Sequence, residues 1–237
     1  MKLELKKIPK NPIIVEGFPG FGLVGTITTE FLIEQLKAKQ IGIIKSDDIP
    51  AMIAIHEGKV INPIGIFYDE KTNILIVHII TSVQGIEWEL ADTIMELAKK
   101  VKAKEIISLE GVASSNMDSD KSKCFYYTTN KKAKSILDKN KIEPLKEGII
   151  LGVTGALLLD ADSFPLSCIF AETHSALPDS IAAAKVIEIL DKLLRMKLDT
   201  KPLMEQAEKF EKKIKSLMEQ TKSVSDIQMK KRLNYVG

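Results

Sequence analysis

A glycine-rich loop near the start of the chain constrains the fold most strongly. The apolar run Pro12–Val15 predicts a buried strand, and Leu23–Ala38 predicts a helix with apolar residues on one face. Between them the chain has the spacing Gly20-x-Gly22-x-x-Gly25. A strand, a tight glycine turn and a helix in this order predict an α/β fold built on a parallel sheet.

Apolar runs alternate with helical patterns along most of the 237 residues. We therefore predict one α/β domain over residues 1–196, with a mostly parallel sheet flanked by helices and an antiparallel excursion near residues 51–68. Strands are predicted at residues 12–15, 41–44, 51–56, 59–61, 65–68, 74–80, 105–109, 124–129, 148–152 and 168–171, and helices at 23–38, 86–100, 131–139 and 178–194.

Residues 197–237 differ from this domain in their pattern. Apolar positions recur there with the alternating spacing of four and three that is typical of an a/d seam, over about three heptads. Such a helix must bury its apolar stripe, either on its own domain or on a partner subunit, and the charged flanks favour a projecting helix. The seam positions are Leu203, Ala207, Phe210, Ile214, Leu217, Thr221 and Val224.

The charge is distributed unevenly along the chain. Residues 197–237 contain 10 Lys/Arg and 6 Asp/Glu, a net charge of +4, whereas the totals of 34 and 32 leave a net −2 for residues 1–196. The basic tail has no aromatic interleaving of the kind that stacks bases, so we predict no nucleic-acid binding. Only Arg195 and Arg232 are arginines, which disfavours bidentate phosphate recognition by the domain.

Composition indicates a globular cytoplasmic protein without a membrane span. The longest nearly apolar run, residues 148–159, is too short to cross a bilayer, and the first residues have charges but no apolar core of a signal peptide. The two cysteines, Cys124 and Cys168, are far apart in sequence. This usage favours a reducing compartment over a disulfide framework.

The glycine loop allows two interpretations. Gly20, Gly22 and Gly25, with the acidic Asp47 and Asp48 after the next strand, satisfy the spacing of a dinucleotide fingerprint. These glycines are therefore ligand-binding candidates, for an anion or nucleotide at the helix start. The alternative is a structural turn in which glycine permits close packing of the helix on the sheet.

Bulky neighbours favour the structural turn. Phe18 and Pro19 precede the fingerprint, and Phe21 lies inside it, where its side chain must face solvent, a partner or a ligand. We find no residue set that predicts catalysis. Cys168, Glu172 and His174 lie within seven residues, but no second His or Cys cluster completes a metal coordination shell. No cofactor or metal is therefore expected.

Four motifs together resemble the proteasome assembly chaperone 2 family, in its archaeal branch. The resemblance covers about residues 10–195. The motifs are residues 16–25 (EGFPGFGLVG), 109–113 (LEGVA), 152–158 (GVTGALL) and 176–180 (ALPDS) leading into 182–184.

The resemblance implies a sandwich similar to purine nucleoside phosphorylase and a homo-oligomer. It also implies a non-enzymatic, ATP-independent chaperone that binds proteasome or related chaperone subunits. A nucleotide- or anion-binding enzyme, hydrolytic or ligase-like, that uses the Gly20–Gly25 loop is the alternative.

In archaeal members a helical C-terminal extension can project from the domain, and some partners of the proteasome α-ring end in hydrophobic-Tyr-any residue. In this sequence Tyr235 is third from the last residue and follows a polar Asn234. Docking of this tail in a shifted register and a tail that does not dock therefore both remain open. The partner-binding candidates are Leu203, Phe210, Ile214, Leu217, Tyr235 and Val236.

Overall fold

The computed structural model describes residues 1–49, 53–56, 58–113, 123–160, 164–173 and 178–201. Its strands are β1 (Lys2–Leu5), β2 (Ile13–Gly17), β3 (Lys39–Lys45), β4 (Ala54–His56), β5 (Lys59–Ile61), β6 (Ile64–Asp69), β7 (Ile74–Ile79), β8 (Glu105–Ala113), β9 (Cys124–Thr128), β10 (Glu143–Pro144) and β11 (Leu166–Thr173). Its helices are a short 3-10 turn η1 (Phe21–Leu23), α1 (Val24–Leu36), α2 (Glu87–Val101), α3 (Lys131–Lys139), α4 (Gly152–Leu159) and α5 (Ser180–Leu194).

Nine strands form one sheet in the order β1-β3-β6-β7-β2-β8-β11-β9-β10, and β4 pairs with β5 in a separate hairpin. The four central strands, β7, β2, β8 and β11, are parallel. The antiparallel part is larger than the predicted excursion, because it also includes β1 and β3 on one side and β9 on the other. β2 lies at the centre of the sheet, so the loop that follows it opens at the carboxyl ends of the parallel strands.

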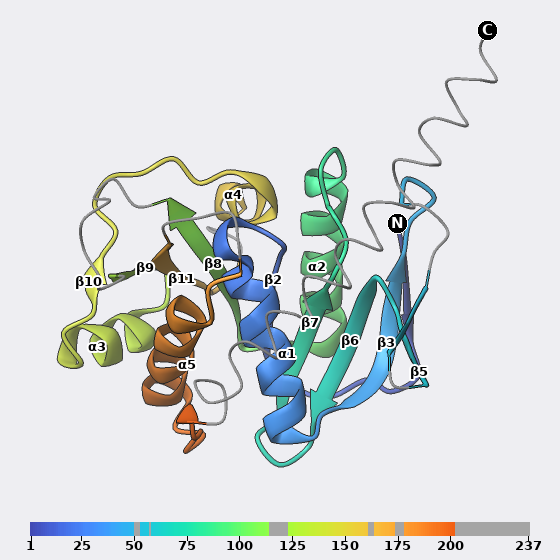
Figure 1. Ribbon diagram of the computed structural model, residues 1–237, viewed down its shortest axis with the longest axis horizontal. Helices are drawn as coiled ribbons and strands as arrows, with labels where there is room; N and C mark the ends of the chain where they lie inside the picture. The colour runs from blue at the N-terminus through green and yellow to red at the C-terminus, as the bar shows by residue number, and fades with distance from the viewer. Residues whose placement is uncertain (50–52, 57, 114–122, 161–163, 174–177, 202–237) are drawn as a thin grey trace, which may run out of the picture.

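Helices cover both faces of the sheet, as Figure 1 shows, and this confirms the predicted α/β sandwich. On one face α1 and α5 pack side by side, with α3 nearer the edge, around Val15, Ile107 and Ile169. On the other face α2 and α4 pack over Ile14 and Ile106. Adjacent residues of β2 thus serve opposite cores, as alternating side chains of a central strand must.

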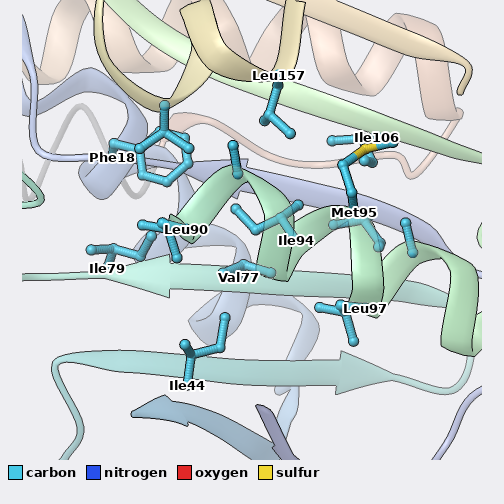
Figure 2. Close-up of a cluster of buried hydrophobic side chains, with 14 of the residues drawn as sticks. Phe18, Ile44, Val77, Ile79, Leu90, Ile94, Met95, Leu97, Ile106 and Leu157 are labelled. Carbon is cyan, nitrogen blue, oxygen red and sulfur yellow. The ribbon is translucent and has the colours of Figure 1, made fainter. Parts of the chain in front are cut away.

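The core under α2 is purely apolar at its centre. Figure 2 shows Leu90, Ile94 and Leu97 of α2 directed at Val77 and Ile79 of β7, and all five side chains are fully buried. Apolar burial contributes about 25 cal/mol per Å² removed from water, so contacts of this kind dominate the stability of the sandwich.

One predicted strand is wrong. Residues 148–151 lie in no strand, and residue 152 begins helix α4 instead. An apolar run does not by itself distinguish a buried strand from a buried helix. The glycines at the two ends of this run, Gly148 and Gly152, resemble the boundaries of a strand. Ile149 and Leu151 are exposed in the connection from β10 to α4.

The last predicted helix begins two residues later than expected. Pro178 precedes the helix, and Asp179 is its N-cap, whose carboxylate accepts a hydrogen bond from the Ala182 amide at 2.9 Å. The predicted helix over residues 203–224 lies outside the described residues. Among those described, no helix is long and apolar enough to cross a membrane.

Candidate functional site at the carboxyl edge of the sheet

The glycine loop brings the backbones of β2, α1 and β8 into direct contact. A Cβ added at Gly25 would lie 2.4 Å from the carbonyl oxygen of Leu109 and 2.9 Å from Cα of Gly17. A Cβ at Gly17 would lie 2.3 Å from the Gly25 oxygen. No side chain fits at these distances, so both glycines serve close packing of α1 on the sheet.

The other motifs pack around the same loop. Gly22 has a φ of 61°, which favours glycine, and its carbonyl accepts a hydrogen bond from the Asp179 amide at 2.9 Å. A Cβ at Gly22 would meet Thr173 Oγ1 at 2.7 Å, and one at Gly111 would meet the Phe21 carbonyl oxygen at 2.0 Å. Residues from the first, second and fourth motifs thus contact one another at one place.

The third motif joins through a hydroxyl pair. Thr154 of α4 lies with its Oγ1 2.9 Å from Oγ of Ser108, and both side chains are buried. The bond ties α4 to β8 directly beneath the loop. All four motifs therefore meet at the carboxyl edge of the sheet, which is where open α/β folds place their binding sites.

Two glutamates lie under this edge. Glu16 of β2 is fully buried, and neither of its carboxylate oxygens has a hydrogen-bond partner of normal geometry among the residues that the structure describes. Burial raises the pKa of Glu16 well above its usual range, with the Ser108 hydroxyl opposing this and the charge of Glu110 adding to it. Burial also raises the pKa of Glu110 to about 7, against a lowering by Thr154.

The same edge contains a buried thiol. Cys168 is fully buried on β11, and burial followed by the charges of Glu16 and Glu110 raises the pKa of the thiol well above its usual range. Such a thiol is a poor nucleophile, since reactivity requires the thiolate. Cys168 is thus suited to packing beneath the loop rather than to nucleophilic chemistry.

A groove of about 820 Å³ opens next to the loop. Its floor is the carboxyl end of β8, and its far wall is the connection from β10 to α4, which runs along the upper edge of Figure 1. Phe21, 52% exposed, stands at its rim. The side chains that line it are mostly apolar or acidic, including Phe21, Phe125, Ile149, Leu151, Glu110, Glu143, Glu147, Glu172 and one basic residue, Lys146.

A second feature adjoins the groove, and we call it the α2–α4 surface. It consists of Trp88 (64% exposed), Leu151 (73%) and Leu159 (71%), around a shallow depression that shares Ile150 and Leu151 with the groove. Large apolar side chains gathered in this way mark protein contact sites more often than scattered single ones do. Amphipathic patterns in the sequence do not predict this surface, because they do not show which apolar residues remain uncovered.

The ligand-binding candidates of the glycine loop have different surroundings. Gly22 and Gly25 are packed against neighbouring atoms as described, whereas a Cβ at Gly20 would meet nothing closer than Glu110 Oε1 at 4.0 Å. A carboxyl group at this position disfavours a phosphate. The partner-binding candidates Leu203, Phe210, Ile214, Leu217, Tyr235 and Val236 lie outside the described residues.

No metal-binding group of three or more His, Cys, Asp or Glu side chains occurs in the part of the chain that the structure describes. His174, one of the three residues weighed for a metal, lies outside that part. Both cysteines, Cys124 and Cys168, are free. The site is therefore defined by packing, an acidic groove and exposed apolar side chains.

The fold is an α/β/α sandwich. Its four sequence motifs meet at a structural turn, and the groove and the α2–α4 surface lie beside that turn. Residues 14–218 match the sequence model of the PAC2 family, and the chain belongs to that family. This confirms the family that the four motifs indicate.

Individual relatives agree with this assignment. The uncharacterized protein MJ0106 of Methanocaldococcus jannaschii is 30% identical over 213 residues, which cover 89% of this chain and 87% of that protein. The fold is similar to the crystal structure of Pyrococcus furiosus PbaA, described as an archaeal homolog of proteasome-assembly chaperone, with a TM-score of 0.84 and 31% identity over 94% of this chain and 99% of that one. P. furiosus PbaB, an archaeal proteasome activator, shares the fold with a TM-score of 0.75 and 23% identity over 91% and 98%.

Proposed function

We propose that this chain is a non-enzymatic, ATP-independent chaperone-like protein that binds proteasome or related chaperone subunits in the cytoplasm. The observation that carries the proposal is the similarity to PbaA, which extends over nearly the whole of both chains at 31% identity. Membership of the PAC2 family supports the same role.

The geometry of the carboxyl edge favours binding over catalysis. Glu16 and Cys168 are fully buried, so neither side chain is placed to reach a substrate as base or nucleophile. Gly25 is packed against backbone atoms, and Gly22 is packed against the side chains of Thr173 and Asp179. The features that remain accessible are a groove and an apolar surface, both suited to protein partners.

We propose that the protein acts as a homo-oligomer that self-associates through the α2–α4 surface. Trp88, Leu151 and Leu159 present large apolar side chains to solvent from adjacent elements. Burying each of them at an interface would contribute roughly 1.5–3 kcal/mol, and aromatic residues such as tryptophan are frequent at the centre of interfaces.

We further propose two functional parts, an α/β domain over residues 1–196 and a helical tail over residues 197–237 that contacts partners. The 4-3 spacing of Leu203, Phe210, Ile214 and Leu217 supports a helical stripe in the tail. Tyr235 and Val236 are the residues expected to enter a pocket of a proteasome subunit.

Affinity purification from native lysate, read by mass spectrometry, tests the proposal. The chain carries an affinity tag at residue 1, away from the tail. A Trp88→Lys variant with the same tag is purified in parallel for comparison. Recovery of proteasome or proteasome-chaperone subunits is the expected result. Recovery of metabolic enzymes, or of the chain alone at saturating bait, would contradict the proposal.

A further inference from the structure

The groove at the carboxyl edge has a composition that specifies a ligand. Four glutamates line it, Glu110, Glu143, Glu147 and Glu172, against the single Lys146, and the side chains between them are apolar. Such a lining fits a peptide that carries several positive charges followed by apolar residues, because it offers carboxylates to the cations and a water-excluding wall to the rest.

The connection that forms the far wall is available for such a contact. Glu143, Glu147 and Ile149 are exposed and lie outside the α2–α4 surface. At the floor, Oε2 of Glu110 is buried without a hydrogen-bond partner in the described protein. The exposed carboxylates of Glu143 and Glu147 are therefore the groups that an incoming cation would meet.

This chain contains a segment of that chemistry. Residues 229–237 read MKKRLNYVG, with three consecutive cations, Lys230, Lys231 and Arg232, followed by apolar and aromatic residues. No other stretch of the chain combines three adjacent basic residues with a following tyrosine. The net charge is −2 for residues 1–196 and +4 for residues 197–237, which also favours pairing of the tail with the acidic groove.

The segment can reach the groove. Twenty-seven residues, 202–228, separate it from the last described residue. If residues 203–224 are helical they span about 33 Å, and the remaining residues add about 16 Å when extended. A domain of this size is about 40 Å across.

We propose that the acidic groove binds the chain's own C-terminal segment, residues 229–237. The cations Lys230, Lys231 and Arg232 pair with the glutamates of the groove, and the residues that follow pack against Phe21 and the wall. Tyr235 and Val236 are also the residues proposed to enter the proteasome pocket. The segment therefore binds either the groove or the proteasome pocket, and not both at once. The groove is then a holding site for the tail.

A peptide titration tests this site. The probe is a fluorescein-labelled peptide of residues 229–237, and the protein is the full chain in which Lys230, Lys231 and Arg232 are replaced by Gln, so that its own tail does not compete. Saturable binding that weakens as NaCl is raised is the expected result. The unmodified chain should bind the peptide more weakly than this variant. Absence of saturable binding overturns the proposal.

Groove variants in the same Gln background locate the site. Glu143→Gln with Glu147→Gln should weaken peptide binding by about twofold to thirtyfold, because two exposed ion pairs are lost. Both side chains are exposed, so folding is not at stake, and Glu96→Gln on the exposed side of α2 is the matched control. Equal peptide affinity for all three proteins overturns the proposal.

Zero-length carbodiimide cross-linking of the unmodified chain gives an independent readout. Isopeptide bonds are expected between Lys230 or Lys231 and Glu143 or Glu147, and cross-links from these lysines only to other carboxylates would contradict the site. The outcome is separable from proteasome binding, because the Glu143→Gln, Glu147→Gln chain should bind the proteasome at least as well as the parent chain.

Discussion

The carbonyl oxygen of Leu109 occupies the space that a side chain at Gly25 would need, 2.4 Å from the position of its Cβ. This contact explains why position 25 of a fingerprint that resembles a dinucleotide loop requires glycine. The glycines let helix α1 approach β2 and β8, and the other three motifs close around the turn.

Replacing Gly25 by Ala should therefore destabilise the protein by about 3 kcal/mol or more, because the methyl group overlaps backbone atoms that cannot move aside. Gly20→Ala is the matched control. Gly20 has an extended backbone and open space around its Cβ position, so its substitution should change the free energy of unfolding by less than about 0.5 kcal/mol. Urea unfolding measures both, and similar effects at the two positions would contradict the structural role.

Inorganic phosphate, ADP and ATP should leave the melting temperature unchanged. A ligand present at a hundred times its Kd would stabilise the fold by about 2.7 kcal/mol, which a thermal-shift assay detects readily. The carboxyl of Glu110 beside Gly20 disfavours such an anion. A clear stabilisation that Gly20→Ala removes would support the enzyme alternative instead.

The pH dependence of stability should contain a contribution from Glu110. Its pKa is raised by burial from 4.5 to about 7, so the folded state binds the proton more tightly than the unfolded chain does. The stabilising contribution is complete below pH 4.5 and is lost as pH rises to about 7. At about 1.4 kcal/mol per unit, the loss is at most about 3 kcal/mol.

Glu110→Gln removes this titration. The variant should gain stability relative to the parent chain as pH rises from below 4.5 to above 7, in urea unfolding curves recorded across that range. Glu96→Gln, an exposed change on α2, is the comparison. A stability difference between Glu110→Gln and the parent that stays constant with pH would show that the carboxyl is not held neutral.

Self-association should depend on the α2–α4 surface. Trp88→Lys and Leu159→Lys are each expected to weaken the oligomer at least tenfold, because a buried large apolar side chain contributes roughly 1.5–3 kcal/mol. Ile181→Lys on α5 is the control, since Ile181 is also exposed and apolar but lies on the other face of the sheet. Light scattering after size exclusion reports the mass. Unchanged mass in the first two variants, or equal loss in all three, would place the interface elsewhere.

The local sequence predicts the core of the fold well. The strand before the loop and helix α1 follow from a buried apolar run and a helical period, and the strongest apolar run became β7 at the centre of the sheet. β1 was missed because Lys2–Leu5 alternates charged and apolar residues over only four positions and pairs at the sheet edge. The pairing partner of such a strand lies forty residues away, where no local pattern records it.

The site was less predictable than the fold. The sequence shows Gly20, Gly22 and Gly25, but only the structure shows that Thr173 and Asp179 pack on Gly22 and that Leu109 packs on Gly25. Glu16 offered one signal, a carboxylate within an otherwise apolar strand, yet its neighbour Glu110 is ninety-four positions distant. The groove and the α2–α4 surface arise from elements that meet only in three dimensions.

The central claim is that the protein binds the proteasome, or subunits of it, through its tail. The direct measurement is co-elution of the purified chain with the proteasome core particle, or its free α subunits, from the organism that encodes it, compared with a chain that lacks residues 233–237. We expect the full chain to co-elute with the proteasome and the shortened chain not to. The circular dichroism spectra of the two chains should be the same, which shows that the deletion leaves the fold intact. Co-elution of both chains, or of neither at saturating concentration, would contradict it.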